Sequence, residues 1–366
     1  MMRADVHPRV SQNIPEIIEI VSKLIGSGHA YVSEGSVYFS IDSMKEKVGA
    51  LSHQPYEALR KGARVEIDER KRNPMDFVLW KASKPGESIA WDSPWGKGRP
   101  GWHIECSAMA IKNLGVNIDI HGGGMDLIFP HHESEIMQTE AYTGKPPFAK
   151  YWVHNGFLMI NKEKMSKSLG NFFLVRDVLK KFSPDALRFF ILNTDYQSPL
   201  DFSDAALDEA QRSLERIQNT VYEVENRIKT PLSGAKALGS ADERLKASLD
   251  KFEHAMDDNL HTREAIAEIF DLSREVNRWL AEGDMPATEW QKVLDLYATY
   301  SQILGIHWTK EQDGKIETEL LDLIVDIRNA VRKKKDFETS DLIRSRLKEI
   351  GITIEDGKEG TTIKRI

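Results

Sequence analysis

Three residues of metal-ligating types, Cys106, His131 and Glu135, stand close together in the sequence. His131 and Glu135 are four residues apart in a predicted helix, His131 to Tyr142, so both side chains project from one helix face. Cys106 lies on the preceding predicted helix, Trp102 to Ile111. Thiolate, imidazole and carboxylate are all zinc ligands, and three protein ligands leave one coordination position open for a substrate.

The spacing alone leaves a purely structural role for these three residues open. A lone cysteine is usually a small buried hydrophobic side chain, and a histidine and glutamate at this spacing usually form a surface pair. His132 and Glu133 stand beside the pair, but only His131 has a glutamate four residues further on. We therefore expect any bound metal on Cys106, His131 and Glu135.

A second candidate for chemistry is the loop Lys164-Met165-Ser166-Lys167-Ser168, which follows a predicted strand, Gly156 to Ile160. Its lysines and hydroxyls could wrap a polyphosphate, and the ammonium groups would stabilise the charge that builds on a leaving pyrophosphate. An ordinary charged surface loop has the same composition, so this pattern alone does not decide the function.

Glycines and an aromatic residue complete the candidate site. Gly122, Gly123 and Gly124 predict a turn that lets the backbone approach a ligand closely, and Asp126 could accept a hydrogen bond from a ribose hydroxyl. Trp102 stands near Cys106 and could form the wall of a small pocket. A tight structural turn and simple core packing are the alternatives for these two features.

The elements that must position these residues predict an α/β sheet. Val116 to Ile120 is predicted to be a short buried strand that runs into the glycine turn, and the helix that follows is closed by Gly144. Strand, glycine turn and helix in this order are typical of sheets that bind ligands at the carboxyl ends of their strands. Earlier in the chain, Pro15 and the spacing of Ile17 to Ile25 predict a helix, followed by strands at Ala30 to Val32 and Val37 to Ile41.

Beyond residue 200 the pattern becomes helical. Three runs, Leu207 to Ile228, Leu245 to Met256 and Ile266 to Leu280, keep helical spacing with charges between the apolar positions, which predicts a helix bundle. The last fifty residues predict two helices and then a hairpin that turns at Asp356 and Gly357.

Composition narrows the class of protein. The chain has 366 residues, with 50 Lys and Arg against 57 Asp and Glu, a formal net charge of −7. This length suggests two or three domains, and the acidity argues against a protein that coats nucleic acid non-specifically. No apolar run approaches the roughly 18 residues of a membrane helix, so we expect no membrane association. The absence of an apolar N-terminal segment and the single cysteine predict the cytoplasm.

Together these segments closely resemble the cysteinyl-tRNA synthetases, a family of class I aminoacyl-tRNA synthetases. The segments that carry the resemblance are Arg72 to Lys81, Gly98 to Met109, Asp119 to Glu135, Lys164 to Phe172 and Ser198 to Ser203. The Lys-Met-Ser-Lys-Ser loop by itself indicates only class I. The Trp-His-Ile-Glu-Cys and Pro-His-His-Glu-Ser-Glu segments point to the cysteine enzyme, from about residue 8 to the C-terminus.

The resemblance implies a fold and four regions. The fold class is α/β, the second half of a Rossmann-type catalytic domain, followed by an all-α helix bundle and a small α+β unit. The regions are a connective insertion with the start of the catalytic region (1–100), the Rossmann half with the zinc site and lysine loop (101–200), a tRNA-binding helical bundle (201–310) and an anticodon-binding unit (311–366).

The resemblance also implies the roles of the site residues. Cys106, His131 and Glu135 match three of the four ligands of one zinc ion that grips the substrate thiolate, and Trp102 matches a residue of the cysteine pocket. A thiophilic metal prefers sulfur over the hydroxyl of serine, which shape alone separates poorly. The implied ATP-binding and tRNA-binding residues are listed together here: catalytic Lys167 with its supporting Lys164, their loop neighbours Met165, Ser166 and Ser168, Gly122, Gly123, Gly124 and Asp126 at the adenosine, and Arg328, Arg332, Lys333, Lys334 and Lys335 at tRNA phosphates.

This sequence departs from the family in several places. It lacks the His-Ile-Gly-His signature that binds ATP phosphates, and it lacks the early cysteine that is the fourth zinc ligand. We expect the half sheet to present an unpaired edge and a bare apolar face, which a separate chain could complete. Asp195-Tyr196-Gln197 stands where the family usually has His-Tyr-Arg, and Ile363 stands where tryptophan is common.

The function implied is that of a cysteine–tRNA ligase, in a truncated or split form. It would use ATP, with Mg²⁺, to convert L-cysteine into cysteinyl-adenylate and would then transfer the cysteinyl group to tRNA(Cys). Two alternatives are a non-catalytic tRNA-binding derivative and a ligase that joins cysteine to an amino-sugar, as in mycothiol synthesis. The complete helical region and C-terminal hairpin favour tRNA over the amino-sugar.

Overall fold

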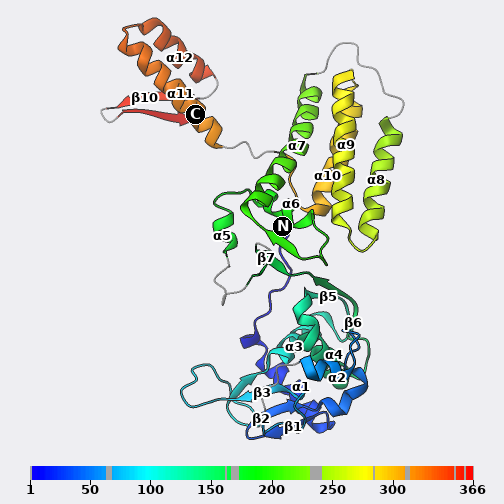
Figure 1. Cartoon of the computed structure of the whole chain (residues 1–366). Helices are drawn as coiled ribbons and strands as arrows, with labels where there is room; N and C mark the ends of the chain where they lie inside the picture. Colours follow the sequence, from blue (N-terminus) through cyan, green and yellow to red (C-terminus); the bar gives the residue numbers. More distant parts are fainter. Residues whose placement is uncertain are drawn as a thin grey trace. The chain divides into compact units, whose positions relative to one another are not determined.

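A computed structural model describes residues 2–62, 68–160, 163–165, 173–230, 241–282, 285–309, 314–349, 352–357 and 360–365. The chain divides into two compact units (Figure 1). The first consists of Met1–Ser213 with Lys246–Leu272, and the second consists of Leu214–Leu245 with Ser273–Ile366. Within the described residues, no helix is both long enough and apolar enough to cross a membrane.

The N-terminal part of the first unit is an antiparallel sheet covered by a helix. The sheet has the order β1-β2-β3-β4. Its elements are α1 (Ile14–Gly26), β1 (Ala30–Ser33), β2 (Ser36–Phe39), β3 (Phe77–Ala82) and β4 (Gly98–Pro100). Figure 1 shows these strands side by side, in blue to cyan. Pro15 stands in the first turn of α1, as the sequence predicts, because proline has no N–H that a first turn would need to pair.

The core between helix and sheet is apolar, and one carboxylate lies buried at its rim. Ile17, Val21 and Leu24, spaced at helical intervals, bury one face of α1 in the same cluster as Val37 and Leu79. Burial of such side chains is the main stabilising contribution to this layer.

The buried carboxylate at the rim is Asp76. It accepts hydrogen bonds from the Tyr31 hydroxyl (2.7 Å), the Ile41 amide (2.9 Å) and the Asn73 amide (3.0 Å). These bonds hold the loop before β3 against β1 and the segment after β2, since a buried carboxylate without donors would be strongly destabilising.

A strand–helix–strand unit follows and carries the predicted site. Its elements are α3 (Trp102–Leu114), β5 (Ile118–Gly124), a π-helical turn (Ile128–His132), α4 (Glu133–Thr143) and β6 (Ala149–Asn155). β5 and β6 are parallel, as expected for two strands joined by a crossover helix. α4 ends at Gly144 in the left-handed conformation, so the predicted helix stop is confirmed.

Two expectations for this unit are wrong. Gly122, Gly123 and Gly124 do not form a turn but continue β5, where they pair with Val153, His154 and Asn155 of β6. The strand is also not buried throughout, because Ile120 is 65% exposed. Among the described residues β5 pairs only with β6, so nothing covers this part of the strand.

The first unit continues with short elements that precede its helices. β7 (Leu158–Ile160) pairs with β8 (Glu163–Lys164) and, in parallel, with β9 (Leu200–Phe202). The remaining short elements of the chain are 3-10 turns at Val10–Gln12, Ile41–Lys47 and Met125–Leu127, and helices α2 (Tyr56–Gly62), α5 (Val175–Val178) and α6 (Pro184–Leu192). Ser183 caps α6 by accepting a hydrogen bond from the Ala186 amide.

Four long helices follow, where the sequence predicts three. They are α7 (Asp204–Lys229), α8 (Ala241–Asp257), α9 (Thr262–Glu282) and α10 (Ala287–Leu304). The three predicted runs correspond to α7, α8 and α9. The fourth helix, α10, buries Trp290 and Tyr297, and the Tyr297 hydroxyl lies 2.7 Å from Ser273 Oγ inside the second unit.

The C-terminal part has the predicted order of elements. α11 (Gly314–Lys333) and α12 (Phe337–Glu349) are followed by the antiparallel hairpin of β10 (Ile352–Gly357) and β11 (Gly360–Arg365). Val325, Leu347 and Ile352 form a small core between the two helices and the first strand. The prediction of a small α+β unit is confirmed.

Candidate functional site

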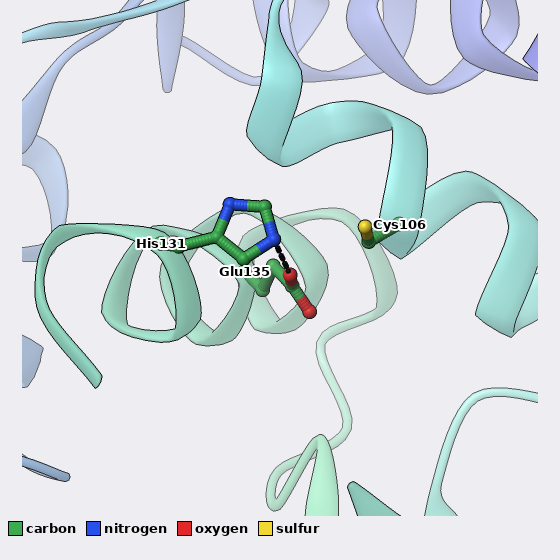
Figure 2. A group of neighbouring side chains, drawn as sticks. All are labelled: Cys106, His131 and Glu135. Atoms are coloured by element: carbon green, nitrogen blue, oxygen red, sulfur yellow. Dashed lines mark ion pairs between the residues drawn. The ribbon is translucent and has the colours of Figure 1, made fainter. Parts of the chain in front are cut away.

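The predicted metal ligands come together from two helices. Cys106 projects from α3, His131 ends the π-helical turn, and Glu135 lies in the first turn of α4 (Figure 2). One ligand atom from each residue can be chosen such that all three lie within 4.8 Å of one another. The helical spacing explains the approach of His131 to Glu135, and the packing of α3 on α4 brings in Cys106.

The Glu135 carboxylate is buried in a way that fits a cation. Its side chain is completely inaccessible, with Oε1 2.7 Å from His131 Nε2 and Oε2 3.2 Å from His121 Nε2. Among the described residues, however, no aligned hydrogen-bond donor points at either oxygen. Since an unpaired buried carboxylate is strongly destabilising, and sulfur, nitrogen and oxygen donors surround one point, these residues fit a zinc ion.

The Cys106 thiol is held in its protonated form when no metal is bound. Burial, and then the negative charge of Glu135, raises the pKa of Cys106 to about 12. A cation bound between the thiol and the carboxylate would reverse this effect, because it favours the thiolate.

A histidine that the sequence analysis did not select orients His131. The Nδ1 atoms of His103 and His131 lie 2.7 Å apart, which leaves His131 Nε2 directed at Glu135. Burial, and then the neighbouring His131, lowers the pKa of His103 to about 4, so the ring is neutral at neutral pH. The Trp-His-Ile-Glu-Cys segment contains this residue, and its position three residues before Cys106 on the same helix was the available signal.

Trp102 lies at the surface beside these histidines. Its ring is 4.4 Å from the His131 ring, between centroids, while its side chain is 60% exposed. A shallow hollow of about 470 Å³ opens next to it and is lined by Phe77, Arg99 and Glu105 among others. Core packing therefore does not account for Trp102, and its position suits the wall of a pocket.

The glycines of β5 allow a close contact inside the protein. A Cβ atom at Gly123 would lie 2.8 Å from His132 Cε1, and one at Gly124 would lie 2.5 Å from Asp126 Oδ1. A Cβ atom at Gly122 would meet only the Val153 carbonyl oxygen, at 3.4 Å. Gly123 is therefore required by the packing of a histidine, a reason that the sequence pattern does not reveal.

The lysine loop lies mostly outside the described residues. Lys164 belongs to β8, and the Met165 amide donates a hydrogen bond to the Leu158 carbonyl oxygen. Ser166, Lys167 and Ser168 lie outside the described residues. The structure therefore places the start of the loop directly after a strand of the sheet.

A second group of histidines surrounds the other side of Glu135. His121 Nε2 lies 3.2 Å from Glu135 Oε2, and His132 Nδ1 lies 2.8 Å from His154 Nε2. Burial, then the charges of His121 and His154, lowers the pKa of His132 to about 3, and burial lowers the pKa of His121 and His154. Sequence reasoning missed His121 and His154 because they come together only through the parallel pairing of β5 and β6.

Glu133, which stands beside the ligands in the sequence, has a structural role. Its carboxylate accepts hydrogen bonds from the backbone amides of Gly49 (2.9 Å), Leu51 (3.0 Å) and Ser52 (2.8 Å). A carboxylate satisfied in this way is not available as a metal ligand. It fixes the segment before α2 to the start of α4.

The predicted basic tRNA contacts divide into two groups. Arg332, Lys333, Lys334 and Lys335 are exposed at the end of α11. Arg328 is only 2% exposed, so its selection as a phosphate contact is wrong. It faces the interior because α11 packs one face against its neighbours, and Arg328 falls on that face.

Comparisons with known proteins agree with the sequence pattern. Residues 1–212 match the model of the "tRNA synthetases class I (C) catalytic domain", and residues 251–308 match the DALR domain. A cysteine–tRNA ligase of Carboxydothermus hydrogenoformans is 49% identical over 366 residues, which are 100% of this chain and 77% of that protein. One from Desulforamulus reducens is 49% identical over 384 aligned positions, covering 100% of this chain and 78% of that protein.

The fold is similar to that of other class I synthetases. Methionyl-tRNA synthetase of Mycobacterium tuberculosis superimposes with a TM-score of 0.52 at 14% sequence identity, over 75% of this chain and 65% of that one. At this identity the likeness concerns the fold alone. The α/β catalytic region predicted from the sequence, and the helical domain after it, are confirmed by these matches. With its identity to the ligases extending over the whole of its length, the chain belongs to the cysteine–tRNA ligase family of class I aminoacyl-tRNA synthetases.

Proposed function

We propose that this chain catalyses the ligation of L-cysteine to tRNA(Cys) with the use of ATP. In the first step the cysteine carboxylate attacks the α-phosphate of ATP, forming cysteinyl-adenylate and releasing pyrophosphate. In the second step the terminal ribose hydroxyl of the tRNA attacks the adenylate carbonyl and AMP leaves. The observation that carries the proposal is the meeting of Cys106, His131 and Glu135 within 4.8 Å, in a chain of this family.

We propose that Cys106, His131 and Glu135 hold one Zn²⁺ ion. The bound ion would supply a thiophilic position for the sulfur of the substrate and so favour cysteine over serine. Trp102 covers one side of His131 with its indole ring, which would exclude water and orient the substrate. His103 fixes the ring of His131, as second-shell groups do at metal sites.

For ATP, with Mg²⁺ as its counter-ion, the proposed contacts lie on two segments. Lys167, with Lys164, Met165, Ser166 and Ser168, would contact the phosphates and stabilise charge on the departing pyrophosphate. Gly122, Gly124 and Asp126 would lie at the adenosine, since the carboxyl end of β5 is where α/β sheets place ligands. Gly123 serves the packing of His132 in addition.

For tRNA, we propose that Arg332 and Lys333 to Lys335 contact phosphates. These side chains are exposed and follow one another at the end of α11. The proposed division of the chain into a catalytic part (1–200), a helical tRNA-binding part (201–310) and an anticodon-binding unit (311–366) agrees with this. The cytoplasm, where tRNA is charged, is the proposed location.

The edge of the β5–β6 pair supports the involvement of a further segment. Ile120 and Tyr151 are neighbours in the register of the two strands, and they are 65% and 68% exposed. Apolar side chains on an open strand edge favour association with another strand or helix. We propose that the family's N-terminal segment, supplied as a separate chain, covers them and completes the ATP site.

The test is cysteine-dependent exchange of pyrophosphate into ATP by the purified chain. It is measured with and without a peptide that carries the family's N-terminal segment. We expect exchange when the segment is present, its loss in Lys167→Ala, and transfer of cysteine to tRNA(Cys) under the same conditions. Absence of exchange in both cases, with tRNA still bound, would contradict the ligase and favour a non-catalytic tRNA-binding role. The amino-sugar alternative predicts cysteine transfer to glucosamine-type acceptors instead, and the DALR match does not favour it.

A further inference from the structure

One half of the Glu135 carboxylate is not used by the zinc site described above. Oε1 lies against His131, whereas Oε2 lies 3.2 Å from His121 Nε2, on the side that faces β5. His121, His132 and Glu135 form a second group whose ligand atoms all lie within 4.8 Å of one another. We propose that this trio binds a second divalent transition-metal ion and that Glu135 bridges the two ions.

The geometry of Glu135 is the first argument. Its two oxygens face different histidines, and neither accepts an aligned hydrogen bond from a described residue. A single ion on Cys106 and His131 accounts for Oε1 and leaves Oε2 buried without a partner. A second ion beside His121 satisfies Oε2 as well. Two-metal sites in proteins hold their ions roughly 3.5–4 Å apart, a separation that one bridging carboxylate spans.

The orientation of His132 is the second argument. Its Nδ1 atom lies 2.8 Å from His154 Nε2, so Nε2 is the nitrogen that remains for a metal. A ligating histidine normally makes such a hydrogen bond through its other nitrogen, which fixes the ring. His132 is almost completely buried, at 1% exposure, so the ring has little freedom to turn away.

Gly123 supplies the third argument, because it leaves room beside this nitrogen. A Cβ atom there would lie 3.2 Å from His132 Nε2 and 2.8 Å from Cε1. Any larger residue would therefore occupy the space next to the proposed ligand atom. The glycine keeps the approach to Nε2 open and the ring in place.

The donor set selects the class of metal. Two imidazoles and a carboxylate, without sulfur, suit Zn²⁺, Co²⁺ or Ni²⁺ and suit Mg²⁺ and Ca²⁺ poorly. The first site differs by containing the Cys106 thiolate. The two positions can therefore be distinguished by spectroscopy, and the inference does not depend on the proposed ligase activity.

The experiment is a titration of the metal-free full chain with Co²⁺. Absorption spectra follow the thiolate-to-cobalt charge-transfer band, and elemental analysis after desalting counts the bound ions. We expect two equivalents. His121→Asn should retain one equivalent with the charge-transfer band, and Cys106→Ser should retain one equivalent without it. Glu135→Gln should weaken both, because it removes the shared ligand.

Matched variants guard against trivial explanations. His53→Asn, at an exposed histidine far along the sequence from the site, should still bind two equivalents. Gly123→Ala should lose the second equivalent, whereas Gly122→Ala, where a Cβ is tolerated, should keep it. Near-ultraviolet circular dichroism establishes that each variant is folded, and an unfolded His121→Asn is replaced in the comparison by His121→Gln.

Three results would overturn the proposal. One equivalent in the unmodified chain would mean that the two groups do not hold ions together. Two equivalents in folded His121→Asn and His121→Gln would place the second ion elsewhere. Loss of all binding in folded Cys106→Ser would mean that only the sulfur-containing site exists. Failure of pyrophosphate exchange, in contrast, bears on the ligase function and leaves the count of ions unaffected.

Discussion

The rings of His103 and His131 meet through their Nδ1 atoms, 2.7 Å apart. His103 comes from α3 and His131 from the turn before α4, so this contact joins the two helices at the point where the candidate ligands converge. The Gln138 side chain strengthens the junction by donating a hydrogen bond to the His103 carbonyl oxygen. The proposed metal site is thus fixed by contacts behind the ligands as well as by the ligands themselves.

Replacing His103 by phenylalanine should weaken zinc binding while the fold is kept. The new ring preserves packing against Phe77 and Trp102 but removes the hydrogen bond that orients His131. We expect the zinc affinity to fall by about 10–100-fold, as for other second-shell changes. Competition with a chromophoric chelator measures this, with His53→Ala as the control. An unchanged affinity would show that His103 does not position His131.

The reactivity of Cys106 in the metal-free chain should report its raised pKa of about 12. Iodoacetamide reacts with the thiolate, and below this pKa the thiol stays protonated. At pH 8 we expect alkylation to be more than ~100-fold slower than for free cysteine. The rate should still be rising at pH 10, where a free thiol has levelled off. A plateau near pH 9 would contradict the effect of burial and of Glu135.

Replacing Glu133 by glutamine should release the segment that contains Gly49, Leu51 and Ser52. One carboxylate serves three backbone amides there, and an amide side chain can accept at only one of its two terminal atoms. We expect the free energy of local opening to fall by ~2 kcal/mol. Hydrogen exchange of these amides should accelerate by roughly thirtyfold. Glu282→Gln, at an exposed position, is the control, and equal exchange in both variants would refute the anchoring role.

Trp102 and Trp290 should respond to truncation in opposite ways. Trp102 is largely exposed, so Trp102→Ala should leave the unfolding transition nearly unchanged and raise KM for cysteine in pyrophosphate exchange. Trp290 is fully buried, so Trp290→Ala should cost ~3–5 kcal/mol of stability. Denaturant unfolding and exchange kinetics on both variants separate the two effects. A large loss of stability in Trp102→Ala would mean that its ring belongs to the core.

The sequence by itself determined the order of the elements and the zinc-type ligand set. Helical spacing in α1 and α7, the proline at the start of α1 and the glycine after α4 are local signals, since each depends on residues within a few turns. The fourth helix, α10, was missed. The i, i+4 spacing of His131 and Glu135 is equally local, and the family motifs added Cys106 to the pair.

Only the tertiary structure decided which neighbours those residues have. The parallel register of β5 on β6 brings His121 and His154 to the buried His132, and the same pairing turns the expected glycine turn into strand. The packing of α3 on α4 brings His103 to His131, and the packing of α11 buries Arg328. These contacts join residues far apart in the chain. Their geometry follows from the way whole elements pack and pair, and no local periodicity encodes it.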